Sequence, residues 1–534
     1  MKKLLVIICF LVCASWVEGA TYYIKNGGND ALDGLSDANA WETIGKISAT
    51  SFSNGDIIQL KRGSVFSDDT LELITGNNIT IQDYDTGAKP FINGDVVMPI
   101  WIHPASTISN LTIKNIDISG QDWQLTKDNN LQINNVSGVT IDGVIGDGHY
   151  GGNTSEGKTA IYISDDCNGD IVVTNCTLYN WGPTNILTGE IDLMGIVIEE
   201  QTAGTYTIAN NTIHDIAADG VHLVDATVTG VVSGNTIYNC GENGIDVKGS
   251  SNVTIISNEF YREVAFTGGG GSGSGTNPHV NVHNGYTNSI SYDCVVDGNY
   301  FHDGDASGVV TGSSTRLIVK NNRFENIKSS VFCGNPVNSL TIANNVIVNP
   351  VYRLTDTSYD SSGIYVNNGG TNVLVVNNTI INNTGTGLQP FTIACMIGAM
   401  IIKNNIVYQN YNSETAYAFW RVNCGAAPTI NNNYWYNPAN NVRTRYNSTT
   451  YSLADEAAWK ASYTQDDFDT PDISTSTYIP NTTSPVIKAG VFVPGVHDQP
   501  GCKDMAGRDC NSMAIPIGAY MSTTIQPTMT GYPH

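Results

Sequence analysis

The sequence has few charged residues, and most of those it has are acidic. Asp, Glu, Lys and Arg make up 14% of 534 residues, with 25 Lys and Arg against 49 Asp and Glu and a formal net charge of −24. Because a nucleic-acid backbone demands a basic surface, this balance predicts a protein that does not bind nucleic acid. The hydrophobic fraction of 41% excludes wholesale disorder.

Long apolar runs are absent after the amino terminus, and so are closely spaced cysteine pairs. Lys2 and Lys3 precede the apolar run 4–12, with small residues near Gly19, a pattern typical of a cleaved secretion signal over residues 1–19. No later stretch approaches the ~20 apolar residues of a membrane helix, so we expect a secreted chain without a membrane span. The 11 cysteines contain no CxxC pair, which disfavours a zinc site and favours small buried side chains.

One short repeat organises most of the chain. A β-branched run ends in one or two Asn residues and is followed by an aliphatic or aromatic residue, as in IANNTI at Asn211 and VKNNRF at Asn322. The shortest spacing between copies is 23 residues, for example from Asn322 to Asn345. This period, with strand-like alternation and no helical pattern, predicts a β-solenoid of about twelve coils. We expect each Asn to occupy a left-handed turn and to bond the same amide one coil away.

The repeat and the two ends of the chain resemble the right-handed parallel β-helix proteins, the pectate-lyase-like superfamily. The ends that carry the resemblance are TYYIKNGGNDALDG at 21–34 and SPVIKAG at 484–490. We therefore predict an all-β fold: one solenoid over residues 20–450 with an amino-terminal cap, and a segment, 451–534, that packs back on it. The resemblance is specific for fold and not for function, because this fold hosts lyases, hydrolases, isomerising enzymes, adhesins and phage spikes.

A second short strand in each coil aligns its polar residues in columns. Aliphatic residues at its second and fourth positions are expected to point inward, so the third and fifth point to water. The third positions are Tyr162, Val197, His222, Asp246, Asn281, Val310, Phe332 and Tyr365. The fifth positions include Glu199, Lys248 and His283. With coils ~4.8 Å apart, these columns predict a cluster of titratable groups and hence a candidate site; the alternative is a solvated polar face.

The predicted site residues divide into two roles. The candidate catalytic residues are Glu199, His222, Asp246, Lys248 and His283. The candidate sugar-binding residues are Tyr162, Asn281, Tyr365 and Arg262. Arg262 stands at the root of a Gly-rich insertion, 263–279, which we expect to wall a cleft, the alternative being an idle excursion.

One coil carries a closer resemblance, to pectate lyases. ENGIDVKGSSNVTIISNEF at 242–260 resembles their calcium-binding coil, unless it shares only a common β-helix consensus. The resemblance implies that Glu242 and Asp246 bind Ca²⁺, with Asp219 as a third oxygen donor. It also implies that Lys248 binds the substrate charge or acts as the base.

Three functions remain open from the sequence. The first is a secreted, monomeric enzyme that cleaves an anionic polysaccharide by β-elimination, which needs a cation for the carboxylate, a base and an acid. The second is a glycoside hydrolase with paired carboxylates, Glu199 with Asp246 or Asp219 with Asp246. The third is a non-catalytic glycan-binding adhesin or spike.

Overall fold

The computed structural model describes residues 19–459 with gaps. The gaps are 68, 95–97, 120–128, 149–157, 182–192, 264–277, 287–288, 305, 351–361, 367–370, 383–390, 396–399, 410–416, 422–427, 437–442, 447–448 and 453–456. The predicted secretion signal, the core of the Gly-rich insertion and nearly all of the predicted segment 451–534 lie outside the described residues.

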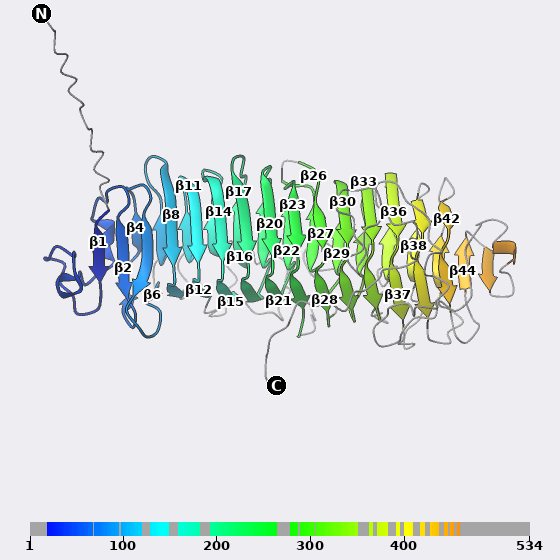
Figure 1. Cartoon of the computed structure of the whole chain (residues 1–534), viewed down its shortest axis with the longest axis horizontal. Helices are drawn as coiled ribbons and strands as arrows, with labels where there is room; N and C mark the ends of the chain where they lie inside the picture. Colours follow the sequence, from blue (N-terminus) through cyan, green and yellow to red (C-terminus); the bar gives the residue numbers. More distant parts are fainter. Residues whose placement is uncertain are drawn as a thin grey trace, which may run out of the picture.

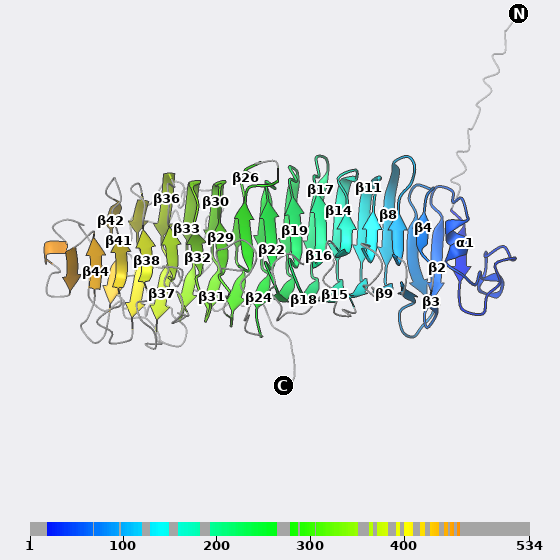
Figure 2. The same cartoon turned by 180° about the vertical axis from the view of Figure 1, so that it is seen from behind.

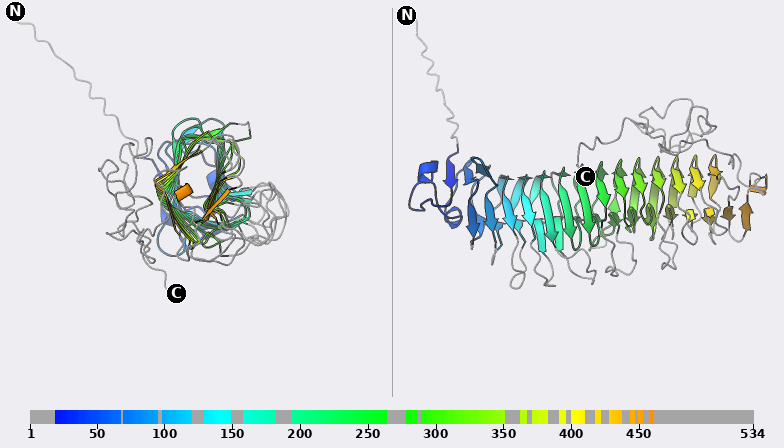
Figure 3. Two further views of the ribbon diagram at one scale, coloured as in Figure 1. Left: turned by 90° about the vertical axis from the view of Figure 1, so that its right-hand side faces the viewer. Right: turned by 90° about the horizontal axis from the view of Figure 1, so that it is seen from below.

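Three β-sheets run side by side along a rod (Figures 1 and 2). Each coil gives one strand to sheet A, one to sheet B and one to sheet C, so the strands of successive coils superimpose when the rod is viewed along its axis (Figure 3). Neighbouring strands are parallel throughout the described residues, except for the final pair. The predicted all-β parallel solenoid is therefore confirmed.

The bounds of the elements are as follows. Sheet A has 16 strands: β1 (Thr21–Ile24), β2 (Ile57–Lys61), β5 (Thr80–Tyr84), β8 (Ile108–Lys114), β11 (Val136–Asp142), β14 (Asn168–Thr174), β17 (Thr205–Ala209), β20 (Thr229–Ser233), β23 (Val253–Ile256), β26 (Ser291–Tyr292), β27 (Val295–Asp297), β30 (Ser314–Lys320), β33 (Val337–Ala343), β36 (Thr371–Val376), β39 (Met400–Lys403) and β42 (Thr429–Asn431). Sheet B has 14 strands: β3 (Val65–Ser67), β6 (Phe91–Asn93), β9 (Asp117–Ser119), β12 (Ile145–Asp147), β15 (Thr177–Trp181), β18 (Thr212–Ile216), β21 (Thr236–Cys240), β24 (Glu259–Tyr261), β28 (Tyr300–His302), β31 (Arg323–Glu325), β34 (Val346–Val348), β37 (Thr379–Asn382), β40 (Ile406–Gln409) and β43 (Tyr434–Tyr436). Sheet C has 15 strands: β4 (Leu71–Leu73), β7 (Ile100–Ile102), β10 (Leu131–Ile133), β13 (Lys158–Ile163), β16 (Leu193–Glu199), β19 (Val221–Val224), β22 (Ile245–Lys248), β25 (Val280–His283), β29 (Val309–Thr311), β32 (Val331–Cys333), β35 (Ile364–Val366), β38 (Phe391–Cys395), β41 (Tyr417–Arg421), β44 (Arg443–Tyr446) and the antiparallel β45 (Thr449–Ser452). A 3₁₀ helix, η1 (Asp37–Asn39), and a short helix, α1 (Gly45–Ser48), lie near the amino end.

The solenoid has more coils than the repeat predicts. Sheet B alone contributes 14 strands among the described residues, against about twelve predicted coils. The additional coils lie before Asn115, where strands such as β2 and β5 stack in register without an Asn doublet at their ends. The predicted count of about twelve comes from the copies of the Asn repeat, which begin at Asn115, and it agrees with the structure from there on.

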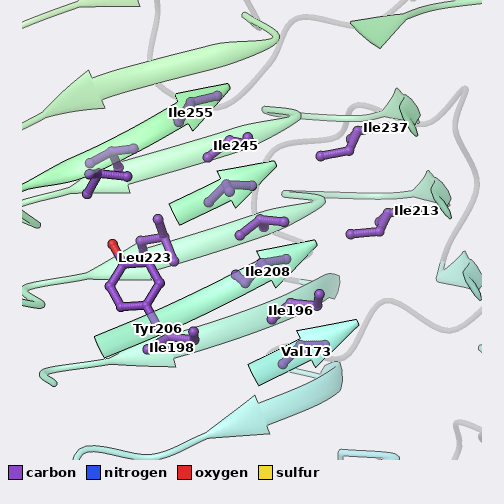
Figure 4. Packing of buried hydrophobic residues seen from close by; sticks show 14 of the residues in the cluster. Val173, Ile196, Ile198, Tyr206, Ile208, Ile213, Leu223, Ile237, Ile245 and Ile255 are labelled. Atoms are coloured by element: carbon purple, nitrogen blue, oxygen red, sulfur yellow. The ribbon is translucent and has the colours of Figure 1, made fainter. Parts of the chain in front are cut away.

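The core is a column of aliphatic side chains that fills the inside of the coils (Figure 4). Alternate residues of each strand point inward, and those on β19 and β22, such as Leu223 and Ile245, are fully buried. Tyr206 also points inward, and its ring occupies the space beside Gly230 on the next coil. A Cβ atom on Gly230 would lie 1.8 Å from the Tyr206 ring, so only glycine fits there.

Two adjacent residues carry the two roles that the sequence analysis gave to one Asn, namely the left-handed turn and the amide contact between coils. The first residue of each doublet takes the left-handed conformation, as Asn344 does with φ of 56°. The second forms a buried amide ladder, in which Nδ2 of Asn322 donates to Oδ1 of Asn345 at 3.0 Å. The same bond joins the successive pairs from Asn211 to Asn433 at 2.8–3.0 Å. The predicted amide-to-amide contact between coils is confirmed.

Two further expectations concern cysteine and the membrane. Five described cysteines, Cys167, Cys176, Cys240, Cys294 and Cys333, are buried and free, as expected for small buried side chains. Within the described part of the chain, no helix has the length and apolarity needed to cross a bilayer.

Candidate functional site

The predicted third-position column lies in one row across sheet C. In strand register, Tyr162 pairs with Val197, Val197 with His222, His222 with Asp246, and Asp246 with Asn281. The row continues through Val310 and Phe332 to Tyr365. The intervening residues of these strands belong to the core, so the row points away from it. The register predicted from the sequence is confirmed.

The predicted exposure of the row is wrong at its centre. His222 and Asp246 each retain only 4% of their accessible surface, and Asp219, at the corner before β19, retains 1%. They lie outside the aliphatic core, yet they are not open to water. The physical reason is that these polar groups are partnered with one another, which offsets the loss of hydration.

Four side chains form a continuous series, which we call the Asp–His chain: Asp219, His222, Asp246 and His283. Nδ1 of His222 lies 2.6 Å from Oδ2 of Asp219 and 3.6 Å from Oδ2 of Asp246. Nε2 of His283 lies 2.9 Å from Oδ1 of Asp246. His283 is the most exposed member, with 26% of its side chain accessible. The Asp–His chain therefore runs from the buried Asp219, at the edge of sheet C, to the accessible imidazole of His283.

Asn243 fixes the buried end of the Asp–His chain. Its backbone N–H donates to Oδ1 of Asp219 at 3.0 Å, and its Nδ2 donates to the same oxygen at 2.7 Å. Asn243 is itself buried, at the corner one coil after Asp219. With Oδ1 committed to Asn243 and Oδ2 to His222, Asp219 is held in one orientation.

Within the Asp–His chain, each charged group favours the charged form of its neighbour. Burial alone would raise the pKa of Asp246, but the bond from His283 and the nearby His222 and Lys248 lower it below its ordinary value. Burial would lower the pKa of His222, but Asp219 and Asp246 raise it. The favoured state is thus an ionised Asp246 beside a protonated His222.

Lys248 lies beside His283 and stays cationic. The two residues are register partners on β22 and β25. Nζ of Lys248 lies 3.7 Å from the ring centroid of Tyr286, which is 66% exposed. Partial burial opposes the charge of Lys248, but Tyr286, Asp246 and Asp219 raise its pKa above the ordinary value. Lys248 therefore offers a positive charge at the accessible end of the site.

The other predicted residues lie at various distances from this centre. Tyr162 is three coils before Asp246, and its hydroxyl donates to the carboxylate of Glu199. Asn281 is the half-buried register neighbour of Asp246. Tyr365, expected as an exposed sugar contact, is 3% exposed and stacks on Phe332 at 5.1 Å.

Arg262 and Glu242 lie at the corner between sheets B and C. Nη2 of Arg262 donates to the backbone carbonyl of Glu242 at 3.1 Å, and Arg262 is buried. Burial, and then the charge of Arg262, hold the pKa of His279 well below its ordinary value. Among the described residues, Glu242 is not part of the metal-capable group at the centre.

The metal-capable group at the centre of the site consists of Asp219, His222 and Asp246. Each can offer one donor atom, and these atoms lie within 4.8 Å of one another. Calcium prefers six to eight hard oxygen ligands. Here one donor is an imidazole, and Asp219 is already fully bonded to Asn243 and His222. This donor set does not fit calcium, and we derive no chemistry from a bound cation.

Sequence reasoning missed Asn243 and Tyr286. Asn243 lies inside the quoted coil motif, but only the stacking of corners shows that its amide faces Asp219. Tyr286 follows β25 by three residues, and a contact that depends on the path of a turn has no periodic signal in the sequence.

The comparisons with known proteins agree on the fold. Residues 194–352 match a family model described as the right handed beta helix region. A tailspike protein of E. coli bacteriophage HK620, solved in complex with a hexasaccharide, superimposes with a TM-score of 0.51 at 12% identity, covering 81% of this chain and 76% of that chain. No curated protein sequence matches. The chain therefore has the right-handed parallel β-helix fold.

Two further solved structures have lower scores. A GH136 lacto-N-biosidase from Eubacterium ramulus gives a TM-score of 0.44 at 14% identity, covering 62% of this chain and 64% of that one. This chain thus spans less than two thirds of that enzyme's length. Pectate lyase Pel9A gives a TM-score of 0.31 at 12% identity, covering 95% of this chain and 97% of that one.

Proposed function

We propose that the protein is a secreted, carbohydrate-active β-helix that cleaves an acidic polysaccharide by β-elimination. The support comes from the site on sheet C, with a carboxylate-bound imidazole and a lysine kept cationic. A solved structure of the same fold is a tailspike in complex with a hexasaccharide.

The observation that carries the proposal is the pairing of Asp246 with His283. Oδ1 of Asp246, ionised and buried, lies 2.9 Å from Nε2 of His283. A neutral imidazole that donates Nε2–H to this carboxylate keeps its lone pair on Nδ1. Asp246 thus orients the ring as a base, and the partial exposure of His283 makes that base reachable by substrate.

Lys248 supplies the charge that an acidic sugar needs. A protein of net charge −24 repels a polyanion unless a local cation attracts it. Lys248 is the register partner of His283, so a carboxylate bound to its ammonium group comes next to the base. Because the pKa of Lys248 is raised, binding the substrate charge suits it better than removing a proton.

The proposed reaction breaks one carbon–hydrogen bond and one carbon–oxygen bond of the substrate. Lys248 binds the uronate carboxylate. Nδ1 of His283 then removes the proton from the carbon next to that carboxylate. The electron pair forms a double bond to the neighbouring ring carbon, and the glycosidic carbon–oxygen bond at that carbon breaks. The departing oxygen takes up a proton from water or from the imidazolium.

The hydrolase alternative has less support from the same geometry. A glycosidase needs one carboxyl group that stays protonated beside the scissile bond. The pKa of Asp246 is lowered instead, Asp219 is buried and bonded on both oxygens, and Glu199 is bonded to Tyr162.

The test is incubation of the mature chain with pectate, alginate and glycosaminoglycans, with and without added calcium. We expect an unsaturated product that absorbs in the ultraviolet, and full activity in the presence of a chelator. Reducing ends without ultraviolet absorbance would support the hydrolase, and no product from any polymer would support a binding protein. Activity that requires calcium would contradict the role given to Lys248.

A further inference from the structure

A second group of polar and aromatic side chains lies on sheet C, toward the amino end from the Asp–His chain. It consists of Trp101, Gln132, Asn134 and Tyr162, and we call it the aromatic platform. Trp101, Gln132 and Tyr162 are register partners on β7, β10 and β13, in the same outward row as His222 and Asp246. All four side chains are partly accessible. Tyr162 lies three coils, about 14 Å, from Asp246.

The platform is held in place by its own contacts. Oδ1 of Asn134 accepts from Nε2 of Gln132 at 2.9 Å and from Nε1 of Trp101 at 3.4 Å. The ring of His103 stacks on the Trp101 ring, with centroids 3.7 Å apart. The hydroxyl of Tyr162 donates to Glu199. Rings and amides fixed before binding lose little conformational entropy when a ligand arrives.

The charges beside the platform have the opposite sign to those at the reactive end. Glu72 is the register neighbour of Trp101, and its carboxylate lies 3.5 Å from Nε2 of His103. At the other end of the platform, Glu199 accepts the hydrogen bond from Tyr162. Among the outward side chains that the structure describes on β4, β7, β10 and β13, none is Lys or Arg. Lys158 begins β13 four residues before Tyr162, about 13 Å along the strand. A second uronate would therefore meet carboxylates here, and no Lys or Arg among the outward side chains described on these strands.

We infer that the platform binds an uncharged sugar residue of the substrate, so that the substrate is a heteropolysaccharide with neutral and acidic residues, not a homopolymer of uronates. The inference rests on the proposed function for the position of the acidic residue, at Lys248. Amide groups that both donate and accept suit sugar hydroxyls, and flat rings suit the apolar face of a pyranose. A polysaccharide that follows the row would reach from His283 to Tyr162 over four coils and to Trp101 over six.

The test measures binding to intact polymers. In a His283→Ala background, which prevents cleavage, calorimetry compares hyaluronan and the rhamnogalacturonan backbone, whose uronates alternate with uncharged sugars, with polygalacturonate and alginate of matched length. We expect at least one alternating polymer to bind about tenfold more tightly than either polyuronate. We expect Trp101→Ala to remove about tenfold of that affinity. Trp101→Phe should retain most of it, and Tyr408→Ala, on the outer face of sheet B, all of it.

The possible failures can be told apart. Tighter binding of the polyuronates, no loss in Trp101→Ala despite an unchanged melting temperature, or no binding of any of the four polymers would overturn the inference. Efficient elimination on polygalacturonate would overturn it and leave the proposed function standing. Platform-dependent binding of an alternating polymer that the wild-type chain never cleaves would overturn the proposed function and leave the binding inference standing.

Discussion

Nδ1 of His222 lies 2.6 Å from Oδ2 of Asp219, and both side chains are buried on the outer side of sheet C. The same nitrogen lies 3.6 Å from Asp246, so one imidazole is shared by two carboxylates. This arrangement links the protonation of a buried group to the stability of the coils that carry the site.

The first prediction concerns the pH dependence of that stability. Because Asp219 and Asp246 raise the pKa of His222 above its ordinary value of 6.5, its charged form stabilises the fold fully below about pH 6.5. The stabilisation is lost as the pH rises through the raised pKa. Thermal melts of wild type and His222→Gln should therefore differ most near about pH 6 and converge as the pH rises through the raised pKa of His222. A difference in melting temperature that grows with pH would show that His222 is neutral in the folded state.

The second prediction concerns the proposed base. His283→Ala should lower kcat by about 10²-fold to 10⁴-fold, the usual contribution of a positioned acid or base, with little change in melting temperature because the side chain is partly exposed. Added imidazole should restore part of the activity. His302→Ala, which removes an imidazole from sheet B, serves as the control and should keep its activity. Equal losses in the two variants would remove His283 from the chemistry.

The third prediction concerns the substrate charge. Lys248→Gln should raise KM for an acidic polymer by about tenfold, because the cation that binds the substrate charge is lost, and should affect kcat less. Added salt should weaken the wild type more than the variant. Lys320→Gln, which removes a lysine from sheet A near Asp297, is the matched control. A variant that loses kcat and keeps KM would make Lys248 the base.

The register of the site could be predicted from the sequence, but its burial could not. The alternation of Val221, His222 and Leu223 fixes which side chain leaves the core, and the Asn repeat fixes how one coil pairs with the next. Whether an outward side chain meets water depends on its lateral neighbours, and contacts such as that of Asn243 with Asp219 join residues 24 positions apart. The length of one coil places Asn243 next to Asp219, but the period does not show that their side chains bond or that they are buried.

The Asn doublet illustrates the same limit at the level of the fold. The sequence predicted an amide ladder correctly, yet it assigned the left-handed turn to the ladder residue itself. In the structure Asn321 takes the left-handed conformation and Asn322 makes the ladder. A repeat shows that an Asn is needed at the turn. Only the backbone angles show which of two adjacent Asn residues takes the left-handed conformation and which forms the ladder.

The fourth prediction tests the ladder. Asn322→Ala removes the acceptor for the backbone N–H and Nδ2 of Asn299, at 2.9 and 3.0 Å, and leaves buried groups without partners. Each such group costs about 1–3 kcal/mol, so the free energy of unfolding should fall by at least that amount. The exposed Asn338 lies in the same region, and Asn338→Ala should change stability little. Similar denaturant midpoints for the two variants would mean that the ladder contributes nothing specific.

The most direct test of the central claim is the fate of oxygen during cleavage. The mature chain is incubated with a susceptible acidic polymer in water enriched in a heavy oxygen isotope, and the fragments are weighed by mass spectrometry. If His283 and Lys248 carry out an elimination, the fragments contain a new double bond and no oxygen from the solvent. Saturated fragments that carry one solvent oxygen per cleavage would contradict the account.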